Sequence, residues 1–97
     1  MLRHIVLLTW TAEATEEQKA TVAAELAKLP GVIPELRRYE IGTDAGLSPG
    51  NADLAVLAEF DDEAGYAVYR DHPAHQAVIN DHIRPILASR VAIQHRL

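Results

Sequence analysis

The chain has 97 residues, 48% of them hydrophobic, a formal net charge of −5 and no cysteine. This length fits one domain, residues 1–97, with a single modest core. The lack of cysteine excludes disulfides, thiolate nucleophiles, iron–sulfur clusters and cysteine-based zinc sites. Because the basic residues are scattered and no apolar run approaches the ~20 residues of a membrane span, we expect neither a nucleic-acid nor a membrane partner.

The first predicted elements are a strand and a helix. Residues 3–10 are rich in apolar and β-branched types over a length too short for a typical helix, which predicts a strand. No signal-peptide pattern precedes this strand, so we expect a cytoplasmic location. Thr15 and Gln18 have the spacing of a capping box at a helix start, and Pro30-Gly31 predicts the end of that helix.

The middle of the chain alternates apolar stretches with turn-rich ones. Its composition predicts a strand at residues 36–43, a loop at 44–52 and a third strand at 53–60. Acidic residues at 61–63 suit the first turn of a second helix, where the helix dipole favours negative charge.

A proline divides the next helical region. Proline disfavours helical geometry at the residue before it, so the second helix is expected to end near His72. Pro73 is well suited to open a third helix that continues until Pro85, with His75 in its first turn. Residues 90–96 predict a fourth strand.

The predicted order, β-α-β-β-α-α-β, indicates an α+β fold with a four-stranded antiparallel sheet. The strands predicted at 3–10 and 53–60 are apolar on both faces, whereas a sheet with one wet face should alternate apolar and polar residues. The helices can cover only one face. We therefore expect a homodimer in which a second copy covers the other face; an ordinary sheet with a few exposed leucines is the alternative.

Ionisable side chains are concentrated in residues 69–75. This segment holds the phenol of Tyr69, the carboxylate of Asp71 and the imidazoles of His72 and His75, and most of the remaining sequence has the pattern of a scaffold. Any chemistry is therefore expected here.

The same segment carries a family resemblance. Residues 3–8, the strand-to-helix stretch 59–63, and Tyr69 through His75 with its His-Pro-x-His core resemble the stress-responsive α/β-barrel domain family, often called Dabb, over essentially the whole chain. The resemblance implies a ferredoxin-like fold that dimerises into an α/β barrel. The fourth strand departs from the acidic-aromatic ending common in the family, since it has Gln94-His95.

The resemblance also implies candidate catalytic residues. A plant member of the family is a polyketide cyclase that closes a linear tetra-β-ketide by aldol condensation without a metal or organic cofactor. Its functional Tyr and His match Tyr69 and His75, and a His in its first strand matches His4. Physical chemistry agrees: a helix start disfavours a charged His75, so a neutral imidazole can act as base while the phenol of Tyr69 donates to an oxyanion.

Other residues near the segment have weaker functional interpretations. We assign ligand-binding roles to Tyr66, His72 and Trp10, although His72 could instead cap the helix, and Tyr66 could belong to the pocket wall or core. Each catalytic candidate also has a structural alternative. Tyr and His side chains at a helix junction, such as Tyr69 and His75, often satisfy backbone groups, and a lone His on an apolar strand, such as His4, is often a hydrogen-bonded core residue. His95 and the Arg37-Arg38 pair are interpreted as solvated surface.

A metal site is the other chemical interpretation of the histidines. His72 and His75 are three residues apart, and nearby carboxylates or imidazoles could add ligands, namely Asp71, Asp81 and His82. The proline junction breaks the helical spacing and no third ligand is clearly placed, so we expect no metal. No sequence pattern requires an organic cofactor.

Two functions stay open from the sequence. One is a cofactor-independent cyclase or lyase acting on a β-keto or phenolic small molecule. The other is a non-catalytic small-molecule-binding or stress-associated protein. In both interpretations the protein is a homodimer with a small-molecule ligand.

Overall fold

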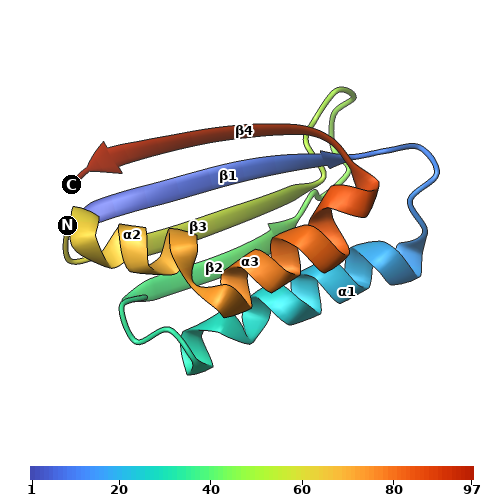
Figure 1. Cartoon of the computed structure of the whole chain (residues 1–97). Helices are drawn as coiled ribbons and strands as arrows, with labels where there is room; N and C mark the ends of the chain where they lie inside the picture. Colours follow the sequence, from blue (N-terminus) through green and yellow to red (C-terminus); the bar gives the residue numbers. More distant parts are fainter.

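Four strands form one antiparallel sheet in the order β2-β3-β1-β4, and the helices cover one of its faces (Figure 1). The computed structural model describes all residues 1–97. The strands are β1 (Leu2–Trp10), β2 (Arg38–Thr43), β3 (Leu54–Phe60) and β4 (Leu87–Arg96). The α-helices are α1 (Glu16–Ala27), α2 (Glu63–Asp71) and α3 (Pro73–Val78). The predicted element order and the α+β class are confirmed, and the fold is ferredoxin-like.

The first helix begins where the capping box predicts. The hydroxyl of Thr15 accepts a hydrogen bond from the backbone N–H of Gln18 at 3.1 Å, and the Gln18 side chain accepts one from the Thr15 N–H at 2.9 Å. After α1 the chain makes a short 3₁₀ turn, η1 (Leu29–Gly31), which contains the predicted Pro30-Gly31 stop. Leu26 and Val22 of α1 are buried against the sheet, so this helix forms one half of the cover.

Two strand boundaries differ from the prediction by more than one residue. The second strand begins at Arg38 rather than at residue 36, because the N–H of Leu36 still bonds the carbonyl of Ile33 in a turn. The fourth strand begins at Leu87 rather than at residue 90, and the difference comes from pairing. The long β1 extends past a bulge at Thr9/Trp10 and pairs with Leu87, a tertiary contact that local composition does not encode.

The helix junction at Pro73 is as predicted. His72 has extended backbone angles (φ −60°, ψ 132°), α2 ends at Asp71, and Pro73 is the first residue of α3. The expectation of one regular helix from Pro73 to Pro85 is wrong, because the type of helix changes along this segment. The α-helix ends at Val78, and the chain continues as a π-helical turn, η2 (Ile79–Ile83), followed by a 3₁₀ turn, η3 (Arg84–Ile86).

The two faces of the sheet have different surroundings. Between sheet and helices lies one core of 15 buried residues, to which β1 contributes Val6, Leu8 and Trp10. The opposite face carries an apolar group on three neighbouring strands, which we call the outer patch: Ile5, Leu7, Ala55, Leu57, Val91 and Ile93. Leu7, Val91 and Ile93 are 40%, 65% and 57% exposed, so nothing within one chain covers this patch.

None of the helices is long and apolar enough to cross a lipid bilayer.

Candidate functional site

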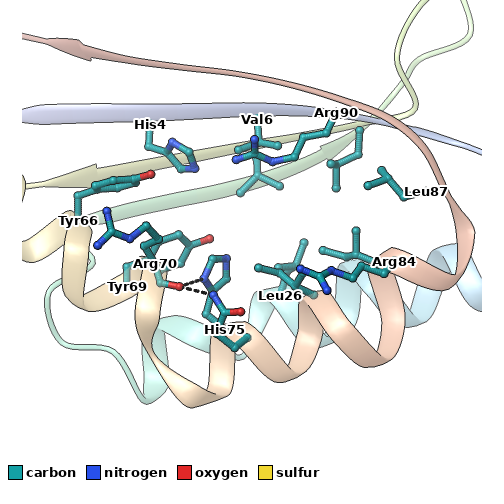
Figure 2. Close-up of a pocket in the computed structure, with 15 residues that line it drawn as sticks. His4, Val6, Leu26, Tyr66, Tyr69, Arg70, His75, Arg84, Leu87 and Arg90 are labelled. Atoms are coloured by element: carbon teal, nitrogen blue, oxygen red, sulfur yellow. Dashed lines mark hydrogen bonds between the residues drawn. The ribbon is translucent and has the colours of Figure 1, made fainter.

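A cavity of about 290 Å³ lies between the sheet and the α2–α3 helices (Figure 2). Fifteen residues line it, and nine of them are hydrophobic, so its walls are mainly apolar. Apolar walls with a few polar groups are typical of small-molecule sites. The polar lining comes from both layers: β1 and β4 supply His4 and Arg90, and the helical segments supply Tyr69 and His75.

The three residues predicted as a reaction centre all line this cavity. The rings of Tyr69 and His75 stack with centroids 4.0 Å apart and an interplanar angle of 27°. The ring of His4 lies 6.2 Å from that of Tyr69 and 5.1 Å from that of Tyr66, which is a fourth predicted site residue on the same wall. The structure therefore brings together His4 and His75, which are 71 positions apart in the sequence.

The helix break explains how His75 is held. In a continuous helix the carbonyl of Arg70 would accept from the N–H of Ala74, but that N–H instead bonds the Nδ1 of His72 at 3.0 Å. The freed Arg70 carbonyl meets Nδ1 of His75 at 3.2 Å and accepts from the Gln76 side-chain amide at 2.6 Å (Figure 2).

This contact fixes the tautomer of His75. A carbonyl oxygen can only accept a hydrogen bond, so Nδ1 must carry the proton, and in the neutral ring Nε2 keeps a free lone pair. Burial lowers the pKa of His75 below its usual 6.5, although the bond to the Arg70 carbonyl works in the opposite direction. The ring is therefore neutral at pH 7, with an unprotonated nitrogen in a cavity.

Tyr69 is a buried phenol with one polar partner. It is only 2% exposed, and its hydroxyl lies 3.1 Å from the hydroxyl of Tyr39 on β2. Burial raises the pKa of Tyr69 to about 12. Burial also raises the pKa of Tyr39, further than that of Tyr69, so both hydroxyls keep their protons at pH 7. A neutral phenol can donate to a developing oxyanion.

His4 is held from the sheet side. The register of β1 and β4 places Gln94 opposite His4, and the Gln94 amide donates to Nδ1 of His4 at 2.8 Å. In this arrangement the proton of a neutral His4 ring is on Nε2. Burial, and then the positive charge of Arg90, lower the pKa of His4 to about 4, so the ring is a neutral hydrogen-bond donor at pH 7.

Two of the predicted binding residues do not line the cavity. His72 uses its Nδ1 to cap α3 through the Ala74 N–H, which is the structural alternative considered from the sequence. Trp10 is 8% exposed and belongs to the core at the far end of β1. The geometry gives neither residue a contact with a ligand in this cavity, since neither is part of its wall.

Sequence reasoning missed the partners that hold the site and the cations that line it: Tyr39, Gln94, Arg70, Arg84 and Arg90. Only Gln94 had a signal, as part of the unusual Gln94-His95 ending of the fourth strand. The others become visible only when strand register and helix packing place them. The surface interpretation of Arg37-Arg38 agrees with their exposed ion pairs, which Arg37 makes with Asp61 and Arg38 makes with Glu40.

The positions of the His, Asp and Glu side chains bear on the metal interpretation of His72 and His75. No group of three or more His, Cys, Asp and Glu side chains lies close enough to hold a metal ion. His72 and His75 use their Nδ1 atoms on different backbone groups, the N–H of Ala74 and the carbonyl of Arg70.

Known proteins resemble this chain over nearly its whole length. A dimeric ferredoxin-like protein of unknown function from Thermobifida fusca is 47% identical, with a TM-score of 0.91 over 99% of this chain and 90% of that chain. A second dimeric protein of ferredoxin-like fold and unknown function, from Bacteroides fragilis, is 26% identical, with a TM-score of 0.84 over 99% and 95% of the two chains.

A more distant structure is the hydroxynitrile lyase of Passiflora edulis, 19% identical with a TM-score of 0.84 over 97% of this chain and 90% of that chain, a similarity that shows the fold alone. Among curated proteins no sequence matches this chain. The family described as Stress Responsive A/B Barrel Domain, or Dabb, matches residues 2–95. The resemblance seen in the sequence is thereby confirmed, and the chain belongs to the stress responsive A/B barrel (Dabb) domain family.

Proposed function

We propose that this protein is a cofactor-independent acid–base enzyme, a cyclase or lyase that acts on a small carbonyl compound of the β-keto or phenolic class. The observation that carries the proposal is the stacked Tyr69–His75 pair at an apolar cavity. In this pair His75 is neutral with Nδ1–H bound to a carbonyl, and Tyr69 retains its phenolic proton.

In the cyclase direction the proposed first step is enolisation. Nε2 of His75 removes a proton from the carbon next to the substrate carbonyl, and the electron pair of that C–H bond moves to form an enolate. The hydroxyl of Tyr69 and Nε2–H of His4 donate hydrogen bonds to the enolate oxygen. Because these donors lie in a mainly apolar cavity, their stabilisation of the developing charge is stronger than it would be in water.

A cyclase and a lyase would run these steps in opposite directions. In a cyclase the enolate carbon attacks a second carbonyl of the same substrate, and the new alkoxide takes the proton from the His75 imidazolium. In a lyase the reverse occurs: His75 removes the proton of a β-hydroxyl, the carbon–carbon bond breaks and the enolate is reprotonated. Both directions return His75 to its neutral state without an external oxidant or reductant.

One contact favours the alternative, a non-catalytic small-molecule-binding protein. The hydroxyl of Tyr69 already has a partner in Tyr39 at 3.1 Å. If Tyr69 donates to Tyr39, its proton is directed away from the cavity and serves packing. If Tyr39 donates instead, the Tyr69 proton is free for a substrate, as the enzyme proposal requires.

We also propose that the protein is a homodimer joined through the outer patch. The patch is apolar across β3, β1 and β4, and Leu7, Val91 and Ile93 are exposed in the single chain. Related structures are described as dimeric. We expect the dimer to bury at least the roughly 1,600 Å² of a standard interface.

Deuterium exchange tests the enzyme proposal. The probes are butyrophenone, which is neutral, and 3-benzoylpropionate, which carries a carboxylate; both have exchangeable protons beside an aryl ketone. Proton NMR in deuterated buffer should show faster exchange of at least one probe with the protein. His75→Ala should lower that rate by about 10²–10⁴-fold, and Tyr69→Phe by about 10²–10³-fold.

The matched control is His82→Ala, since His82 does not line the cavity. This variant should keep the full rate. If the protein does not accelerate exchange of either probe, or if His75→Ala is as fast as the unaltered protein, the binding-protein alternative replaces the enzyme.

A further inference from the structure

The basic residues of this chain divide into two groups. There are nine lysines and arginines, and seven of them form ion pairs with carboxylates. The two that form none are Arg84 and Arg90, and both line the cavity. A third arginine of the wall, Arg70, is already paired with Asp71 at 2.9 Å.

The acidic residues have the opposite distribution. The chain has 14 aspartates and glutamates, yet none of them lines the cavity. A chain of net charge −5 therefore contains a cavity with a cationic wall. Both unpaired arginines are exposed in the single chain, so water solvates them in the empty cavity and their N–H groups are free to pair with an anionic ligand.

The two unpaired arginines approach the cavity from different layers. Arg90 reaches in from β4, beside Val6 and His4, and Arg84 reaches in from the helical side (Figure 2). The register of the sheet explains the first position, because Arg90 is opposite Leu8 and so shares the helix-facing side of the sheet with His4. The hydrophobic wall beside the arginines includes Leu87, Ile83 and Leu26.

We propose that Arg84 and Arg90 bind the carboxylate of a small organic substrate whose apolar part fills the rest of the cavity. A guanidinium group presents a planar pair of N–H donors that matches a carboxylate. The cavity of about 290 Å³ suits a body of one or two rings. The proposal rests on the proposed function in one respect: the carboxylate would hold a carbonyl of the same molecule near Tyr69 and His75.

The electrostatics of the site are consistent with such a substrate. The positive charge of Arg90 adds to the lowering of the pKa values of His4 and His75, and it partly opposes the rise that burial causes in the pKa of Tyr69. A bound carboxylate would offset that charge. It would therefore make His75 a stronger base when the substrate is present than when the cavity is empty.

Binding of unreactive aromatic probes tests the proposal. 2-Naphthoate and 2-naphthamide have nearly the same shape, but only the first carries a charge, and phenyl phosphate tests the other common oxyanion. Calorimetry at millimolar ligand should show that naphthoate binds about 10- to 100-fold more tightly than naphthamide, the ratio expected for charge-assisted hydrogen bonds. It should also show that naphthoate binds more tightly than phenyl phosphate.

The variants are Arg84→Gln, Arg90→Gln and both together. Each single change should reduce the preference for naphthoate over naphthamide, and the double change should abolish it. The matched control is Arg37→Gln, which removes the same charge from an exposed surface pair with Asp61 and should keep the full preference.

Three results would overturn the carboxylate site: equal binding of naphthoate and naphthamide, no binding of naphthoate, or a preference that survives in the double variant. Tighter binding of phenyl phosphate would also reject a carboxylate ligand. The outcomes are separable from those of the enzyme proposal. Exchange of butyrophenone that needs His75, without a naphthoate preference, keeps the enzyme and rejects this site, whereas the preference without any exchange keeps this site and rejects the enzyme.

Discussion

Tyr69 and His75 stack face to face with their ring centroids 4.0 Å apart, one on each side of a break between two helices. In a regular helix, positions six residues apart do not share a face closely enough to stack. Pro73 removes one backbone donor and His72 takes another, so the chain turns and the two rings meet. The break that interrupts the helix therefore also assembles the candidate site.

The protonation of His75 gives the first prediction. Nitrogen-15 NMR of the imidazole should show a proton on Nδ1 and none on Nε2 at about pH 7.5, with a folded-state pKa below the usual value of about 6.5. Burial is the main cause. A pKa above 7, or a neutral ring with its proton on Nε2, would contradict the base role.

His4 should make folding sensitive to mild acid. Its folded pKa of about 4 lies below the unfolded value of 6.5, so between these values the unfolded chain binds more protons. The contribution of neutral His4 is complete above pH 6.5 and is lost as the pH falls towards 4. With allowance for solvent screening in the cavity, the loss is on the order of 2 kcal/mol.

Urea unfolding at about pH 7 and pH 4.5 tests the predicted contribution of His4 to the free energy of unfolding. The unaltered protein should lose more unfolding free energy between these conditions than His4→Gln, which has no titrating group at this position. Carboxylates titrate in both proteins and so cancel in the comparison. Equal losses in the two proteins would show that burial of His4 does not lower its pKa.

His72 is predicted to have a structural role at the start of α3. Its Nδ1 accepts from the N–H of Ala74, so His72→Ala should lower the unfolding free energy by about 1 kcal/mol, the usual cost of losing an N-cap. His72→Asn keeps an acceptor and should restore most of that loss. Chemical denaturation measures both. If the two variants are equally stable, the ring of His72 does not act as a cap.

The homodimer is tested by paired valine substitutions. Val91 is 65% exposed on the outer patch and Val68 is 44% exposed on α2, on the helical side of the sheet. Val91→Asp should place a charge in the dimer interface and give a monomer by light scattering, whereas Val68→Asp should stay dimeric. A monomer in the unaltered protein at tens of micromolar, or a dimer in Val91→Asp, would reject the outer patch as the interface.

Local sequence signals predicted much of the fold. The capping box at Thr15, the turn residues Pro30-Gly31 and the stop imposed by Pro73 act over a few residues, and the structure has each feature at its predicted place. The start of β4 at Leu87 was missed because it depends on pairing with β1 across a bulge. The π-helical turn at Ile79–Ile83 was also missed, since its apolar spacing is compatible with an α-helix.

The candidate site was predictable only in part, because some of its side chains reach it through tertiary contacts that local sequence does not encode. The motif from Tyr69 to His75 is contiguous in sequence, so its residues could be grouped before the structure was known. Gln94 reaches His4 through strand register, and Arg84 reaches the cavity through the winding of the last helical turns. No local pattern distinguishes these side chains from surface residues.

The pH dependence of deuterium exchange tests the central claim, that neutral His75 is the base and Tyr69 a protonated donor. The protein-catalysed rate should rise through a pKa below about 6.5 and then stay level from about pH 7 to 9, because the phenol of Tyr69 holds its proton to a pKa of about 12. His75→Ala should remove this profile. A catalysed rate that keeps rising between about pH 7 and 9, or a profile unchanged in His75→Ala, would contradict the assignment.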